Sequence, residues 1–155
     1  MKIWVDADAC PGPVRDILLR ASQRLNIPTV FVANKRLTLP RSELVSTVQV
    51  GAGLDVADGY IASSAEAGDL AVTQDIPLAA LLVPKGVVVL DPRGELFSEE
   101  NIAERLSVRN FMQELRDSGV MTGGPSGFSA QDRQQFAASL DRELTRLLKA
   151  RSGAR

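Results

Sequence analysis

Histidine is absent from this chain of 155 residues, and cysteine occurs only once, at position 10. Without histidine, the chain can build neither a Ser-His-Asp or Cys-His catalytic set nor a histidine-ligated zinc site. A single cysteine forms neither an internal disulfide nor a thiolate cluster that holds a metal. Catalysis and metal binding that need histidine or more than one cysteine are therefore excluded.

An excess of one charge and long apolar runs are also missing. Lys and Arg total 18 and Asp and Glu total 19, which gives a net charge of −1. The chain therefore has no global basic field, and contact with nucleic acid would need a local patch. The first residues carry charges, and no apolar run approaches the roughly 18 residues of a membrane span. We therefore expect no signal peptide, no membrane contact and a cytoplasmic location.

Short apolar runs alternate with helical patterns along the first two thirds of the chain. We predict strands at 2–6, 27–33, 45–50, 70–73 and 87–90, and intervening helices from 13, over 54–64 and over 76–82. The last third is helical, over 99–118 and from 129, with a Gly-rich break at 122–127. This order predicts a single α/β domain over 1–150, with three α/β/α layers, a mainly parallel sheet and a frayed tail at 151–155.

Acidic side chains follow two of these strands where each strand ends. Asp6 and Asp8 end the first strand, and Asp75 follows the fourth, two residues after Thr73. Ligands of open parallel sheets bind outside the carboxyl ends of the strands, where carboxylates can hold a hard cation such as Mg²⁺ or Mn²⁺. The competing explanation is that Asp8 and Asp75 only cap the turn or helix that follows. Asp69 lies at the opposite, amino end of the fourth strand, so we expect it to be a solvated loop residue.

Further candidates surround this edge of the predicted sheet. Asp55 and Asp58 share one face of the middle helix, and Asp58 is the better candidate for a third carboxylate, although a solvated helix face explains both. Arg15 stands in the first turn of the first helix, and Asn34 and Lys35 follow the second strand. All three can contact a phosphate. The alternative is that Arg15 pairs with a carboxylate and that Asn34 and Lys35 are ordinary solvated surface residues.

Two other features favour a structural explanation. Cys10 precedes Arg15 by five residues, whereas the loop of cysteine-dependent phosphatases needs six, so we expect Cys10 to be a small buried thiol. The glycine-rich run at 123–127 precedes a helix and could cradle an anion. It does not end in Gly-Lys-Ser/Thr as a P-loop does, and a plain linker explains it equally well.

Several segments together resemble the bacterial YaiI/YqxD family: KIWVDADACP at 2–11, VAN at 32–34, GDLAVTQDIPLA at 68–79 and TGGPSGFSAQDRQQF at 122–136. That family is in turn similar to the PIN-like nuclease superfamily, which places aspartates after strand one, on a middle helix and in a (T/S)xD motif after strand four. The resemblance implies a PIN-like fold. In this chain the three aspartate positions of the superfamily correspond to Asp6, Asp58 and Asp75, and Asp8 is an acidic residue beyond that set.

The leading hypothesis is a metal-dependent phosphodiesterase, most simply a ribonuclease, with catalytic residues Asp6, Asp8 and Asp75. The expected ligands of Mg²⁺ or Mn²⁺ are these three and Asp58, and the expected substrate contacts are Arg15, Asn34, Lys35 and Thr73. RNA or another phosphodiester is the expected partner, and a homo-oligomer is left open. One alternative is a haloacid-dehalogenase-type phosphatase, with Asp6 as nucleophile and Asp8 as general acid. The other is an RNA- or nucleotide-binding module without turnover.

Overall fold

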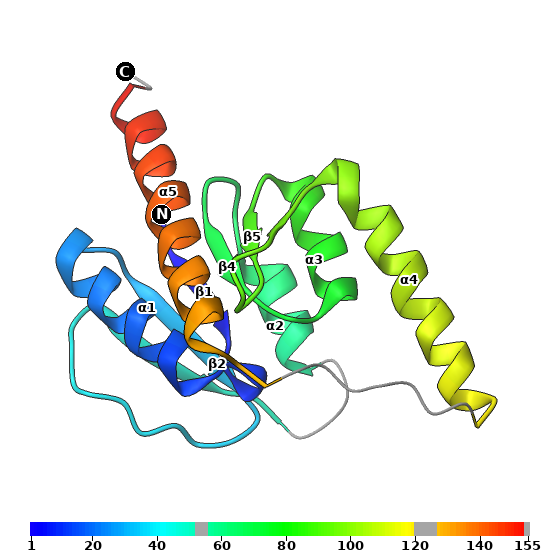
Figure 1. Ribbon diagram of the computed structural model, residues 1–155. Helices are drawn as coiled ribbons and strands as arrows, with labels where there is room; N and C mark the ends of the chain where they lie inside the picture. The colour runs from blue at the N-terminus through cyan, green and yellow to red at the C-terminus, as the bar shows by residue number, and fades with distance from the viewer. Residues whose placement is uncertain (52–55, 120–126, 154–155) are drawn as a thin grey trace.

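The computed structural model describes residues 1–51, 56–119 and 127–153 (Figure 1). Its six strands are β1 (Ile3–Asp6), β2 (Thr29–Ala33), β3 (Val45–Gln49), β4 (Leu70–Val72), β5 (Val88–Leu90) and β6 (Leu96–Phe97). They form one sheet in the order β3-β2-β1-β4-β5-β6. All neighbouring pairs are parallel except β5 and β6, which are antiparallel. The carboxyl ends of β1 and β4 therefore lie side by side in the middle of the sheet.

The α-helices among the described residues are α1 (Gly12–Leu25), α2 (Val56–Ser64), α3 (Ile76–Leu82), α4 (Glu99–Asp117) and α5 (Ala130–Gly153). Helices α1 and α5 cover one face, and α2 and α3 cover the other (Figure 1). The predicted three-layer α/β/α fold with a mainly parallel sheet and a helical C-terminal third is confirmed. Helix α5 continues to Gly153, three residues into the segment expected to be a frayed tail. No helix within the described ranges is long and apolar enough to cross a membrane.

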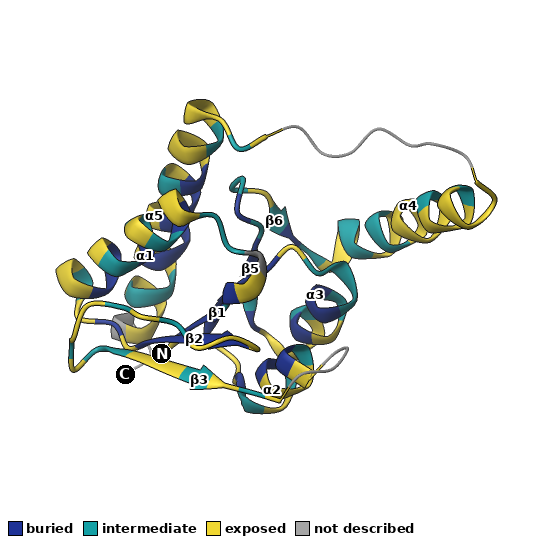
Figure 2. Cartoon of the chain, turned by 90° about the horizontal axis from the view of Figure 1, so that it is seen from below, coloured by how far each residue is buried: buried dark blue, intermediate teal, exposed yellow. Residues whose placement is uncertain are grey.

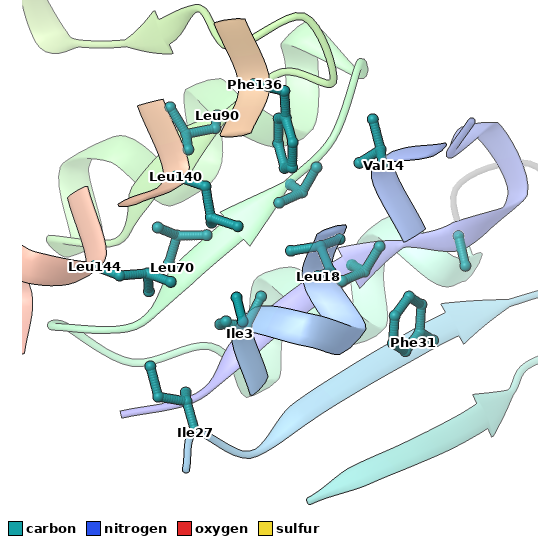
Figure 3. Packing of buried hydrophobic residues seen from close by; sticks show 14 of the residues in the cluster. Ile3, Val14, Leu18, Ile27, Phe31, Leu70, Leu90, Phe136, Leu140 and Leu144 are labelled. Atoms are coloured by element: carbon teal, nitrogen blue, oxygen red, sulfur yellow. The ribbon is translucent and has the colours of Figure 1, made fainter. Parts of the chain in front are cut away.

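The buried strands explain why the apolar runs are nearly continuous in the sequence. Side chains alternate across a strand, so Ile3 and Val5 point into the core beneath α1 and α5, whereas Trp4 packs beneath α2 and α3. Figure 3 shows the first of these two cores, where Leu18 of α1 and Phe136 of α5 meet over the sheet. Parallel strands that are covered on both faces need apolar residues at every position.

Helix α4 differs from the other helices because it stands away from the core (Figure 2). Ser98 begins it with a capping box, accepting a hydrogen bond from the Asn101 N–H at 3.2 Å. The helix packs against α3, yet none of its residues is buried, and the Phe111 side chain is 58% exposed. Its helical spacing was evident in the sequence, but its position outside the core was not.

The expectation that Asp69 is a solvated loop residue is wrong. Asp69 is only 7% exposed, and its carboxylate accepts three hydrogen bonds. The donors are the backbone N–H of Lys2 at 3.0 Å, the Trp4 indole N–H at 3.0 Å and the backbone N–H of Glu66 at 2.9 Å. This side chain joins the amino ends of β1 and β4, far from the carboxyl edge.

Replacing Asp69 by alanine is expected to lower the free energy of unfolding by about 3 kcal/mol, because one buried and two part-buried donors lose a charged acceptor. Urea unfolding followed by circular dichroism measures the loss. Asp16→Ala, at an exposed position on α1, is the control and should change stability by less than about 0.5 kcal/mol. Equal losses in the two variants would show that the buried contacts of Asp69 contribute nothing.

Candidate functional site

A chain of hydrogen bonds joins the carboxyl ends of β1 and β4. Because the register pairs Val5 with Val72, the next residues along, Asp6 and Thr73, lie side by side. The Thr73 hydroxyl donates to Asp6 Oδ2 at 2.9 Å and accepts from the backbone N–H of Asp75 at 3.0 Å. Thr73 is buried and Asp6 is half-buried, so the threonine holds the two acidic residues in a defined arrangement.

Asp75 has a second role as the N-cap of α3. Its Oδ1 accepts a hydrogen bond from the Leu78 N–H at 2.9 Å, and a proline follows in the first turn of the helix. The positive end of the helix dipole stabilises the carboxylate there. The capping explanation and the site explanation of Asp75 are therefore compatible, since capping orients the carboxylate at the edge of the sheet.

Asp8 lies in the short 3-10 helix that follows β1, Ala7–Ala9. Its Oδ2 accepts a hydrogen bond from the backbone N–H of Asn34, directly after β2, at 2.9 Å. Asp8, Asn34 and Lys35 are exposed. The carboxyl ends of β1 and β2 are joined in this way, much as Thr73 joins those of β1 and β4.

The electrostatics of Asp6 reflect this crowding of carboxylates. Burial raises the pKa of the Asp6 carboxyl above its ordinary value, the hydrogen bond from Thr73 opposes this, and the charges of Asp75 and Asp8 raise the pKa further. The three carboxylates are thus close enough to repel one another. As they are placed, however, the described residues include no group of three acidic or cysteine side chains that could hold a metal ion.

Comparison with known sequences decides the family. Residues 4–146 match the family described as "Uncharacterized BCR, YaiI/YqxD family". The chain belongs to the YaiI/YqxD family. Among its relatives are three proteins called "UPF0178 protein". The one from Myxococcus xanthus is 80% identical over 149 residues, which cover 96% of this chain and 97% of the relative. Those from Syntrophobacter fumaroxidans and Geobacter metallireducens are both 58% identical, over 96% of this chain and 97% and 96% of the relatives. No solved structure matches the chain.

The other predicted site residues of this YaiI/YqxD family member lie around the carboxylates. Asp58 is half-buried in the first turn of α2, which packs against β1 and β2. Asp55 lies outside the described residues, as do residues 123–126 of the glycine-rich run. Arg15 Nε is buried without a hydrogen-bond partner among the described residues, and its charge acts on the neighbouring Cys10 thiol. Arg15 as a whole is half-buried, and its contact with a phosphate stays a prediction.

Sequence reasoning missed a pocket of about 360 Å³ beside the carboxylates. Gln74, directly before Asp75, lines one side of it, and Arg93, in the turn after β5, lines another. The position of Arg93 could have been inferred, because β5 is parallel to β4 and the turn after it reaches the same edge. A larger pocket, of about 910 Å³, lies between α1 and the residues that precede β3, at the amino ends of the strands and away from this site.

Proposed function

We propose that this YaiI/YqxD family member is a divalent-metal-dependent phosphodiesterase with RNA as its substrate. The observation that carries the proposal is the convergence of Asp6, Asp8 and Asp75 at one edge of the sheet, with Asp6 and Asp75 joined through Thr73. In open α/β sheets this edge is where ligands bind. Asp58 is the candidate for a fourth carboxylate, because α2 packs against β1 and β2.

The residues suit a hard cation in their chemistry. Mg²⁺ and Mn²⁺ prefer carboxylate oxygens, and each of the three aspartates uses one oxygen in the hydrogen bonds to Thr73, Asn34 and Leu78. Burial raises the pKa of Asp6, and the charges of Asp75 and Asp8 raise it further; a cation would offset both effects. When bound, the metal supplies an activated water and stabilises negative charge on the phosphate. No histidine is needed for this chemistry.

The carboxylates have distinct tasks in this proposal. Thr73 fixes the orientation of Asp6, and the N-terminus of α3 fixes that of Asp75. Asp8, the most exposed of the three, is the proposed acceptor of a proton from the attacking water. Asn34 and Lys35, exposed beside it, can contact the phosphodiester backbone.

Calorimetric titration with Mn²⁺ tests the proposal. The parent protein is expected to bind the ion, and both Asp6→Asn and Asp75→Asn should bind it at least about tenfold more weakly. Asparagine is also a good N-cap, so Asp75→Asn should fold normally. Because burial raises the pKa of Asp6, protons compete with the metal at higher pH than for an ordinary aspartate, and the affinity should fall as the pH is lowered. Asp16→Asn, at an exposed position on α1, is the control.

Three results would contradict the proposal. If the parent does not bind Mn²⁺, the carboxylates are not a metal site. Covalent phosphate trapped on Asp6 would favour the haloacid-dehalogenase-type phosphatase instead. RNA binding with no cleavage in Mg²⁺ or Mn²⁺, unaffected by Asp6→Asn, would identify a binding module without turnover.

A further inference from the structure

Two pockets join into one groove beside the carboxylates. The first, of about 360 Å³, lies between the residues after β4 and the turn after β5. The second, of about 530 Å³, runs along one side of α4. Ile76 and Arg105 line both pockets, so the two are adjacent, and together they are called the groove below. One end of it is lined by Gln74 and Ile76, the two residues that flank Asp75 in the chain.

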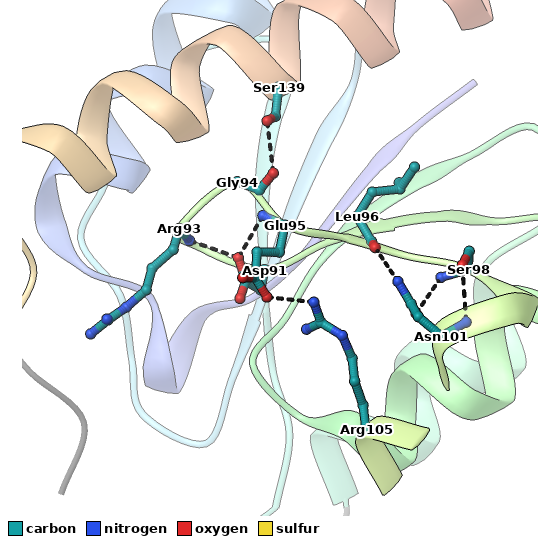
Figure 4. Close-up of polar contacts among 9 residues, drawn as sticks. All are labelled: Asp91, Arg93, Gly94, Glu95, Leu96, Ser98, Asn101, Arg105 and Ser139. Carbon is teal, nitrogen blue, oxygen red and sulfur yellow. Dashed lines mark hydrogen bonds and ion pairs between the residues drawn. The ribbon is translucent and has the colours of Figure 1, made fainter. Parts of the chain in front are cut away.

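The groove is basic although the chain as a whole is not. Its lining contains four arginines against two carboxylates, which gives a net charge of +2; the arginines are Arg93, Arg105, Arg109 and Arg116 and the carboxylates are Asp91 and Glu104. Arg105 is held by an ion pair with Glu95 (Figure 4) and lies over the Phe97 ring, 4.8 Å from its centroid. Arg109 and Arg116 extend from exposed positions further along α4. The groove is therefore a local basic patch, as contact with nucleic acid would require.

Apolar and aromatic side chains lie among these cations. Phe97 and Phe128 line the part beside the carboxylates, and Val108 and Met112 line the part along α4. Val108 is 56% exposed. Single strands of nucleic acid are bound by this combination, in which cations follow the phosphates while bases stack on apolar or aromatic surfaces. Arg105 and Arg116 are about 17 Å apart along the helix axis, which spans several phosphates rather than one.

A second copy of the chain fits this surface less well. A symmetric dimer places the same patch of both copies in contact. An interface centred on the groove would therefore bring Arg105, Arg109 and Arg116 of one copy towards the same residues of the other, and like charges in contact oppose binding. The charge of the groove is complementary to a polyanion.

We propose that this groove binds a single-stranded phosphodiester chain and leads it to Asp6 and Asp75. One part of this inference rests on the proposed function: the nucleic-acid strand is led towards Asp6 and Asp75 only if these residues form the cleavage site. The binding itself needs no metal. Arg109 and Arg116 contact phosphates, and Val108 and Met112 contact bases. Val108 and Met112 can contact only unpaired bases, so a single strand is expected to bind better than a duplex.

Fluorescence anisotropy with a labelled oligouridine of about 12 nucleotides, in the presence of EDTA, tests the groove. The double variant Arg109→Glu/Arg116→Glu is expected to bind at least about tenfold more weakly than the parent. The slope of log affinity against log salt should be smaller in magnitude by at least about 1.4, the value for two lost phosphate contacts on a single strand. A duplex of the same length should bind the parent more weakly than the single strand.

The matched control is Arg20→Glu/Lys149→Glu, which makes the same change in net charge at exposed positions on α1 and α5. It should lose less than about threefold in affinity. Equal losses in both double variants, or no binding by the parent, would overturn the proposal. Light scattering reports the mass of each protein, and a parent dimer that Arg109→Glu/Arg116→Glu separates would identify the groove as an interface between copies. The anisotropy assay contains no metal, so its result does not depend on the Mn²⁺ titration. Failure of the groove and failure of the metal site can therefore be told apart.

Discussion

Replacement of Gly94 by alanine is expected to lower the free energy of unfolding by about 3 kcal/mol, from strain and overpacking together. Gly94 has a φ of +91°, in the left-handed region that favours glycine, and an added Cβ would lie 2.6 Å from the backbone oxygen of Gln135. Its own carbonyl accepts a 2.7 Å hydrogen bond from the Ser139 hydroxyl (Figure 4). The turn after β5 therefore lies directly on α5, with no room for a side chain. Urea unfolding measures the loss.

Gly68 supplies a matched control for the effect of the clash. Its φ is +90°, yet an added Cβ would have nothing within 4 Å. Gly68→Ala should therefore cost only the backbone strain, about 1 kcal/mol. If both variants lose the same free energy of unfolding, the close approach of Gly94 to α5 does not add to the cost of a side chain at this position. Since this turn carries Arg93 into the groove, Gly94→Ala that still folds should also weaken oligouridine binding while leaving Mn²⁺ binding unchanged.

The thiol of Cys10 is expected to react about a thousandfold more slowly with iodoacetamide in the folded protein than in the unfolded chain, near about pH 8. Burial raises the pKa of Cys10 to about 12 from the ordinary 9.0, more than the charge of Arg15 lowers it. Each unit of pKa removes a factor of about ten in thiolate, and the thiolate is the reactive form. Because Cys10 is the only cysteine, mass spectrometry of the intact chain follows this residue alone.

The unfolded reference is the same protein in concentrated urea. Fast labelling of the native protein would contradict the buried thiol and would reopen nucleophilic chemistry at Cys10. Slow labelling agrees with the spacing of five residues between Cys10 and Arg15, which does not form the loop of cysteine-dependent phosphatases. The carboxylates would then remain the reactive groups at this edge of the sheet.

The central part of the fold and the position of the acidic edge could be predicted from the sequence. Apolar runs bounded by turn residues predicted β1, β2, β3, β4 and β5, and helical spacing predicted the five α-helices, because these patterns follow from local backbone geometry. The parallel arrangement of β1 to β5 then places the carboxyl ends of these strands at one edge. This is why Asp6 and Asp75 were expected near each other and are joined through Thr73.

Contacts between distant segments required the tertiary structure. Strand β6 has only two residues, too few for a period to show in a sequence. Asp69 was expected to be solvated, because only the folded sheet brings the Trp4 indole and the Lys2 N–H to its carboxylate. The groove joins Arg93 to arginines of α4 that lie on no predicted strand end. Local patterns determine elements and their ends, whereas the partners of a buried charge and the walls of a groove depend on how those elements pack.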